Sequence, residues 1–245
     1  MKVEKVEGLI IGETNYSESS KILKVFTKEH GIISIMSKGC RNLKSKLRGV
    51  STKLTYASFQ IHYKEDGIST LTEADVIDTL KNIRLDIEKI YYVSYIIDIA
   101  EQVYKHSSNK SIYDILISVI KKINENYDPS VLIIIMKLKL LDFLGIKPNV
   151  DSCSICGNTK NILTISIEDG GFICQNCYKC GKIYNDKIIK LIRMFVYIDI
   201  DSISKINLSD GAKKELEQFI YEYYDVYSGI YLKELDLKKI SKLEI

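Results

Sequence analysis

The chain has 245 residues, of which 46% are hydrophobic and 27% charged, and its formal net charge is +3. This composition excludes intrinsic disorder over most of the chain, and the small net charge by itself points to no partner. The most apolar run, residues 131–136, is far shorter than the ~20 residues that a membrane-spanning helix needs. Glu4 and Glu7 also interrupt the apolar core that a secretory signal requires, so we expect a cytoplasmic protein.

The first 80 residues predict five short β-strands. Runs rich in β-branched and aromatic residues alternate there with turn residues such as Gly31 and Gly67. The predicted strands are residues 3–11, 20–27, 32–37, 52–63 and 69–76. Five strands in about 75 residues predict a small closed or partly closed barrel such as an OB-fold, whose exposed face commonly binds oligonucleotides.

A block of positive charge lies around the connection between the third and fourth predicted strands. Residues 30–64 contain no Asp or Glu, whereas the rest of the chain has a net negative charge. The cations of the block are Lys38, Arg41, Lys44, Lys46, Arg48, Lys53 and Lys64. Such a one-sided cluster is typical of a surface that binds a polyanion, and it favours nucleic acid over a membrane surface. The alternative is a loop whose lysines only keep it solvated.

After residue 80 the hydrophobic period becomes helical. Apolar residues three and four apart predict amphipathic helices over 83–104 and 112–123. Asp128-Pro129 supplies an N-cap and a first-turn proline for a third helix, which stops at Gly145. Because the first half of this third helix is apolar nearly all round, we expect it to be the central buried helix of a bundle. A fourth helix is predicted to start at Ser209-Asp210.

Four of the six cysteines have the spacing of metal ligands. Cys153 and Cys156 form one C-x-x-C pair, and Cys174 and Cys177 form a second pair after seventeen intervening residues. Two such turns direct four thiolates at one ion, which is typical of a tetrahedral zinc site. Two disulfides or two redox dithiols are the alternatives. Four thiolates leave no open coordination position, so one structural Zn²⁺ per chain is predicted.

The fifth cysteine of this segment leaves the second ligand pair ambiguous. Cys177-x-x-Cys180 followed by glycine mirrors Cys153-x-x-Cys156 followed by glycine. Spacing alone therefore does not decide whether Cys174 or Cys180 completes the site. Cys40 stands alone in the basic block, and we interpret it as a small residue without a chemical role.

The sequence predicts a binding module and no enzyme. It contains no phosphate-binding loop, dinucleotide fingerprint, H-E-x-x-H or G-x-S-x-G motif. The three histidines are scattered, and we interpret them as surface or turn residues. Asp199 and Asp201 offer the alternative of a metal-assisted nuclease, although a solvated turn explains them more simply. Among the tyrosines after residue 220, Tyr223 and Tyr227 fit the spacing of a helix core.

Several short motifs are spread over nearly the whole chain. They are Glu7-Gly8-Leu9-Ile10-Ile11, Tyr16-x-Glu18-Ser19-Ser20, Thr27-x-Glu29-x-Gly31, Lys38-Gly39-x-Arg41, Ser45-x-Leu47-Arg48-Gly49, Leu71-x-Glu73, Cys153-x-x-Cys156-Gly157, Gly170-Gly171-Phe172 and Cys174-x-x-Cys177. Together these motifs resemble one known family, the bacterial RecO family of recombination mediators. One departure is Leu232-Lys233-Glu234, where the family has a Leu-Lys-Ser element.

The resemblance implies an α+β architecture and a function. An OB-fold over residues 1–80 would precede a helical domain over 81–149 and 185–245, with a four-cysteine zinc insertion over 150–184. The family binds single- and double-stranded DNA and anneals complementary strands coated with the single-strand binding protein SSB. It loads the recombinase together with RecR, uses no nucleotide and works at the nucleoid. The resemblance also favours Cys174 and Cys177 over Cys180 as ligands.

Charge and resemblance converge on the connection between the third and fourth strands as the DNA-binding element. Its cations can neutralise phosphates without reading sequence, as annealing of arbitrary strands requires. The predicted DNA-binding residues are Lys38, Arg41, Lys44, Lys46 and Arg48. Tyr16 and Tyr56 are candidates for base stacking, and a groove between helices is the expected dock for the acidic, apolar SSB tail. A zinc-containing protein-interaction scaffold with no direct DNA role is the alternative.

Overall fold

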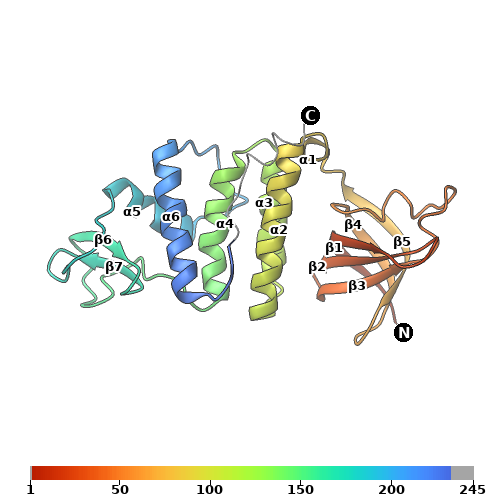
Figure 1. The fold of residues 1–245 in the computed structure, drawn as a ribbon, viewed down its shortest axis with the longest axis horizontal. Helices are drawn as coiled ribbons and strands as arrows, with labels where there is room; N and C mark the ends of the chain where they lie inside the picture. The colour runs from red at the N-terminus through yellow and green to blue at the C-terminus, as the bar shows by residue number, and fades with distance from the viewer. Residues whose placement is uncertain (1, 233–245) are drawn as a thin grey trace. The chain divides into compact units, whose positions relative to one another are not determined.

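The computed structural model describes residues 2–232, which fall into two compact units. One unit comprises the residues up to Asp86 together with Ser108–Ile117, and the other comprises Ile87–Ser107 and the residues from Ser118 onward. The five strands of the first unit and the helices of the second are labelled in Figure 1. Among the described residues, none of the helices has both the length and the apolar character needed to cross a bilayer.

The first unit is built on a five-stranded barrel. Its strands are β1 (Lys2–Asn15), β2 (Lys21–Thr27), β3 (Gly31–Ser37), β4 (Tyr56–Tyr63) and β5 (Ser69–Asp78). They follow the order β1-β2-β3-β5-β4, and β4 pairs again with β1, which closes the sheet. All neighbouring strands are antiparallel except β3 and β5. The predicted OB-fold is confirmed (Figure 1).

Alternate residues of these strands fill the interior of the barrel. The core consists of Val6, Ile10, Leu23, Val25, Ile35, Ala57, Phe59, Ile61 and Leu71. The fourth strand begins later than predicted, because residues 52–55 form turns. Leu54 adopts a left-handed φ of 66°, which an extended strand does not allow. Its backbone N–H donates to the Ile10 carbonyl at 2.9 Å, so the segment folds back onto β1.

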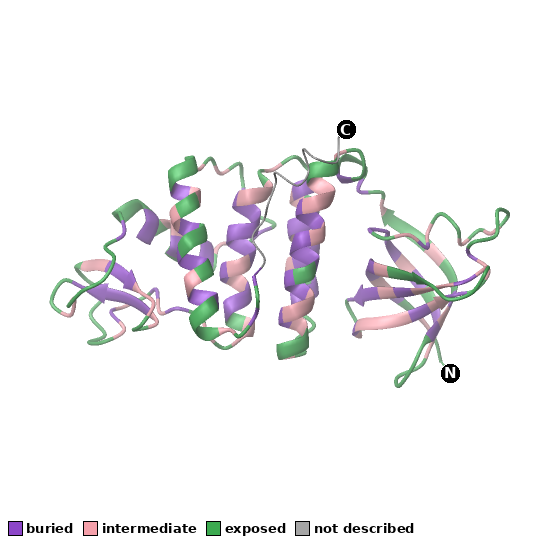
Figure 2. Cartoon of the chain, in the orientation of Figure 1, coloured by how far each residue is buried: buried purple, intermediate pink, exposed green. Residues whose placement is uncertain are grey.

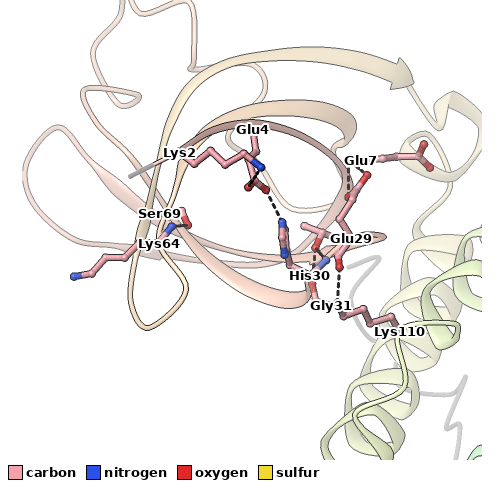
Figure 3. A network of polar contacts seen from close by, with 10 residues as sticks. Lys2, Glu4, Glu7, Glu29, His30, Gly31, Lys64, Ser69 and Lys110 are labelled. Atoms are coloured by element: carbon pink, nitrogen blue, oxygen red, sulfur yellow. Dashed lines mark hydrogen bonds and ion pairs between the residues drawn. The ribbon is translucent and has the colours of Figure 1, made fainter.

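A polar network ties the start of α3 (Ile112–Asn124) to the barrel within this first unit (Figure 3). The Glu7 N–H donates to both carboxylate oxygens of Glu29, and Lys110 Nζ donates to the Glu29 carbonyl at 2.6 Å. Glu7 Oε1 in turn accepts the hydroxyls of Tyr56 at 2.6 Å and Tyr113 at 3.2 Å. Burial and the nearby carboxylate raise the pKa of both hydroxyls, so both remain donors.

The helices are α1 (Lys81–Arg84), α2 (Ile87–Ser107), α3, α4 (Pro129–Phe143), α5 (Asp186–Tyr197) and α6 (Asp210–Tyr227). The single helix predicted over 83–104 is wrong in one respect, because the chain turns between α1 and α2. Leu85 at this break is 76% exposed, and Ile87, on the apolar track that suggested continuity, is 46% exposed, so the track includes a residue outside the core. The predicted start of α6 is confirmed, since the Ser209 hydroxyl accepts the N–H of Ala212.

Helix α4 is the buried centre of the second unit, as the sequence predicts. Asp128 caps its first turn by accepting the Ser130 N–H at 2.9 Å, and Pro129 takes the first helical position. All six residues of 131–136 are buried, and α2, α5 and α6 pack against α4 (Figure 2). Gly145 follows the helix with a positive φ of 72°, which ends it.

The segment between α4 and α5 contains a small hairpin that the sequence did not predict, formed by β6 (Ile162–Ser166) and β7 (Gly171–Cys174). Its strands are short and lie between cysteine turns, so they lack a long alternating pattern. The departure at Leu232-Lys233-Glu234 lies mostly outside the described residues.

Candidate nucleic-acid interface and metal centre

The basic loop, residues 38–55, connects β3 to β4 and carries every predicted DNA-binding cation. Its first half is a succession of tight turns. The Asn42 N–H donates to the Gly39 carbonyl at 3.1 Å, Ser45 to Asn42 at 3.0 Å, and Arg48 to Ser45 at 3.2 Å. A loop closed by its own hydrogen bonds presents its side chains from a defined scaffold, which lowers the entropy lost on binding.

Arg41 fastens the basic loop to the connection between β1 and β2. Its backbone N–H donates to the Ser19 carbonyl at 2.9 Å, and its Nη1 donates to the Ser17 carbonyl at 2.6 Å. The Gly39 N–H adds a third link to Ser20 Oγ at 3.2 Å. Part of the Arg41 guanidinium is therefore already engaged, which gives this residue a structural task besides its charge.

The other predicted cations of the loop face solvent. Lys38, Lys44, Lys46 and Arg48 are exposed, and none of them forms an ion pair with any residue of the described range 2–232. Four unpaired charges on one loop remain available for an anion. Cys40 is 2% exposed, so its side chain packs in the interior.

The two tyrosines predicted to stack on bases differ sharply. Tyr16, in the connection between β1 and β2, is 63% exposed. Tyr56 is buried and its hydroxyl binds Glu7, so the prediction for Tyr56 is wrong. Sequence reasoning also missed Leu43, which is 83% exposed in the middle of the basic loop. A large apolar residue with cations on both sides was the available signal.

A shallow hollow of 380 Å³ lies on β1, β2 and β3. It is lined by Gly12, Glu13, Thr14, Ile22, Lys24, Ile32, Ile33 and Ser34. Gly12 pairs with Lys24, and a side chain at Gly12 would lie against the Lys24 Cβ at 3.6 Å. The hollow is therefore open at Gly12, where β1 carries no side chain. It lies on strands of the kind by which OB-folds bind oligonucleotides.

In the second unit the structure brings together the four cysteines that the resemblance favours. The Sγ atoms of Cys153, Cys156, Cys174 and Cys177 all lie within 4.8 Å of one another, and those of Cys156 and Cys174 are 3.7 Å apart. Zn–S bonds of about 2.3 Å in a tetrahedron place sulfurs about 3.8 Å apart, so the cluster has the size of a zinc site. Cys180 is exposed and lies outside this group. Among the described residues, the four cysteines are the sole group of side chains that could hold a metal ion.

Two similar tight turns present these thiols. In the first turn the Cys153 carbonyl accepts the N–H of Gly157 at 2.9 Å, and Gly157 has a positive φ of 73°. In the second turn the Cys174 carbonyl accepts the N–H groups of Cys177 at 3.1 Å and Tyr178 at 3.0 Å. The C-x-x-C spacing therefore acts as the sequence predicts, by turning both sulfurs of a pair to the same side.

The environment of the thiols is suited to a cation. Burial raises the pKa of Cys153, but hydrogen bonds from the backbones of Cys174, Cys156 and Ile155 outweigh it and lower that pKa to about 6. The hydrogen bond with Cys156 and burial raise the pKa of Cys177 to about 12. Four thiolates at this separation repel one another, so the cluster needs a bound cation to hold them all ionised.

The remaining candidates occupy structural positions. The Asp201 N–H donates to Asp199 Oδ1 at 3.3 Å and Ser202 Oγ donates to the Asp199 carbonyl, so this pair forms a turn. Tyr223 is buried, as predicted, whereas Tyr227 is 37% exposed. His30, in the turn between β2 and β3, accepts or donates a 2.8 Å hydrogen bond with Glu4.

Comparison with known protein families gives a match over almost the whole chain. Residues 1–80 match the family described as the N terminal part of recombination protein O. Residues 84–236 match the family described as its C terminal part. The boundary between the two matches falls directly after the barrel strands.

Curated relatives cover the same length. A DNA repair protein RecO of Listeria monocytogenes serotype 4b is 32% identical over 247 residues, covering 99% of this chain and 96% of the relative. One from Halalkalibacterium halodurans is 35% identical over 233 residues, covering 94% and 91%. One from Bacillus pumilus is 31% identical over 233 residues with the same coverage.

Proposed function

The chain belongs to the RecO family of DNA repair proteins, and from this premise we propose that it is a recombination mediator that binds single- and double-stranded DNA and anneals complementary strands. Membership of the family supports a role in DNA repair and recombination. The proposal of DNA binding and strand annealing rests on the barrel and its basic loop. It assigns no catalysis and no nucleotide to the protein.

The single observation that carries the proposal is the set of exposed, unpaired cations on a loop without acidic residues. Each cation that neutralises a phosphate releases a condensed counterion, which favours binding without reference to sequence. The loop leaves an OB-fold, a scaffold that commonly binds oligonucleotides. We therefore assign phosphate binding to Lys38, Arg41, Lys44, Lys46 and Arg48, with Arg41 also holding the loop in place.

Annealing follows from the same surface. Two complementary strands repel each other through their phosphates, and a basic surface lowers that repulsion while raising the local concentration of both strands. A contact that reads only phosphates accepts any pair of strands. No bond is broken in this process, so the protein needs no catalytic group.

The proposal includes partners beyond DNA. Within the family's role, the protein would act on strands coated with SSB and load the recombinase together with RecR. This work would place it at the nucleoid in the cytoplasm. The acidic, apolar tail of SSB is expected to dock on the helical unit, since an apolar anchor beside a cation suits a groove between helices.

We also propose that the cysteine cluster holds one structural Zn²⁺. The distances between the sulfurs fit a tetrahedral ion, and four protein ligands leave no position for water or substrate. Such an ion would fix the turns at Cys153 and Cys174 and support the fold of residues 150–184. It would take no part in DNA binding chemistry.

A salt titration of single-strand affinity tests the DNA site. The variant replaces Lys38, Lys44, Lys46 and Arg48 with alanine and keeps Arg41, which fastens the loop. Each phosphate contact contributes about 0.7 to the slope of log affinity against log salt, so the slope should fall by roughly 3. The measurement is fluorescence anisotropy of a labelled oligonucleotide at several salt concentrations.

The control variant removes the same charge from the helical unit. It replaces the exposed lysines Lys160, Lys187, Lys190 and Lys214 with alanine. If the basic loop is the site, this variant keeps the slope of the unmodified protein. An unchanged slope in the loop variant would contradict the assignment. Failure of the unmodified protein to bind DNA would favour the interaction scaffold instead.

A further inference from the structure

Leu43 is the most exposed large hydrophobic residue in the described part of the chain, at 83%. It stands between Arg41 and Lys44, at a turn where the Ser45 N–H donates to the Asn42 carbonyl at 3.0 Å. The phosphate-binding role proposed for the loop needs only cations at this point. An apolar side chain held out from a hydrogen-bonded turn therefore calls for a contact of another kind.

Tyr16 is a second exposed apolar group on a segment fastened to the same loop. It is 63% exposed, and its N–H donates to the Ser20 carbonyl at 3.0 Å, which closes the turn between β1 and β2. Ser20 Oγ accepts the N–H of Gly39 from the basic loop at 3.2 Å. The two segments that present Tyr16 and Leu43 are thus joined by direct hydrogen bonds.

We infer that Tyr16 and Leu43 contact the faces of unpaired DNA bases while the cations of the basic loop hold the phosphates. Aromatic rings stack on any base, and apolar side chains such as leucine pack against base faces or enter base steps. The charge of the loop favours DNA over an apolar protein partner, because residues 30–64 contain no acidic residue and four cations of the loop are unpaired within the described range.

This inference rests on the proposed function and adds a substrate preference to it. The base faces of a duplex are covered by their neighbours, whereas those of a single strand are free to be stacked on a side chain. Tyr16 and Leu43 therefore add affinity for single strands and little for duplex. The cations can neutralise phosphates of both substrates.

The test compares three labelled ligands of one length: a single-stranded oligothymidylate, the same strand made entirely of abasic sites, and a duplex. The unmodified protein should bind the strand with bases about tenfold or more tighter than the abasic strand. Tyr16→Ala should lose most of that difference, and Leu43→Ala should weaken binding to the strand with bases about fivefold. Both variants should keep the salt slope and the duplex affinity.

Ile68→Ala is the matched control. Ile68 is also exposed, at 40%, but it lies in the turn between β4 and β5 that carries Glu65 and Asp66. This substitution should change none of the three affinities. Because Tyr16 and Leu43 are exposed, both variants should fold, and thermal unfolding checks this.

The outcomes separate this inference from the proposed function. If the unmodified protein binds strands with and without bases equally, or if Leu43→Ala and Tyr16→Ala change no affinity, the base contact is overturned. The salt slope of the four-alanine loop variant remains an independent test of the phosphate site. If the salt slope falls in the four-alanine variant, the proposed function stands. If, at the same time, Tyr16→Ala and Leu43→Ala still bind the strand with bases more tightly than the abasic strand, as the unmodified protein does, only the base contact is rejected.

Discussion

Gly171 shows how one residue without a side chain positions the cysteine cluster. A Cβ at this position would lie 2.4 Å from the Asn149 carbonyl oxygen, closer than atoms approach. Its absence lets Asn149 pair with Gly171 in a parallel bridge, and the Phe172 carbonyl accepts the Ser154 N–H at 2.7 Å. The turn at the first cysteine pair is thereby held against β7, the strand that ends at Cys174.

At the same scale, the fourth ligand of the proposed zinc site can be identified by substitution. Cys174→Ser should lose the metal, because a buried ligand of the cluster is removed, whereas Cys180→Ser should keep it. Metal content per chain, measured by plasma mass spectrometry after gel filtration, decides between them. Loss of zinc in Cys180→Ser with retention in Cys174→Ser would move the site to the alternative pair. Hydrogen exchange after metal removal should rise first in residues 150–184.

Among the elements, α4 contains a charged residue, Lys137, next to its most apolar run. Lys137 follows the fully buried run 131–136, and its Nζ lies 5.0 Å from the centroid of the Tyr95 ring on α2. Burial lowers the pKa of Lys137 to about 8, and Glu217 on α6 opposes this only in part. Holding the charged form inside the bundle therefore costs free energy near neutral pH.

The prediction for this helix is a change of stability with pH. Between pH 8 and 10 the unfolded chain keeps the Lys137 proton while the folded chain has lost it, so the free energy of unfolding should rise with pH. Lys137→Met should remove this rise and stabilise the protein by about 1–2 kcal/mol at pH 7, allowing for the lost contact with Tyr95. Urea unfolding at pH 7, 8, 9 and 10 measures it.

The exposed Lys190 provides the control for that series. Lys190→Met removes a charge from α5 without changing a buried site, so its effect should be small at every pH. Above pH 10, ionisation of tyrosines that are buried in the folded state lowers the free energy of unfolding of the unmodified protein and of both variants alike. This effect therefore cancels when the three proteins are compared. A destabilised Lys137→Met at pH 7 would mean that the contact with Tyr95 outweighs the cost of burial.

Elements whose signals are local were predictable from the sequence, and those that depend on distant contacts were not. Asp128-Pro129 and Ser209 act through their own backbone, so the starts of α4 and α6 followed from the residues. The burial of Tyr56 depends on Glu7 and Tyr113, residues from elsewhere in the chain. Likewise, spacing alone did not decide whether Cys174 or Cys180 is the fourth cysteine of the cluster. Cys174 belongs to it because β7 of the hairpin ends there, beside the other three cysteines.

At the scale of the whole molecule, the two units divide the proposed work. The barrel unit carries the basic loop with Leu43 and Tyr16, whereas the helical unit has a buried core around α4 and the cysteine cluster. Binding of bare strands would then need only the barrel unit. Recognition of a protein on the strand would need the helical unit, and the two activities should be separable by changing the substrate alone.

The last prediction uses that separation, with full-length protein and no nucleotide. The protein should anneal bare complementary strands and strands coated with intact SSB if, as proposed, the basic loop binds phosphates and the helical unit holds the SSB tail. Deleting the tail from SSB should leave annealing of bare strands unchanged and abolish recruitment to coated strands. Strand pairing is followed by loss of donor fluorescence, and recruitment by co-sedimentation with the coated strand. Equal recruitment to both forms of SSB would reject docking of the tail, while failure to anneal bare strands would reject the proposed function itself.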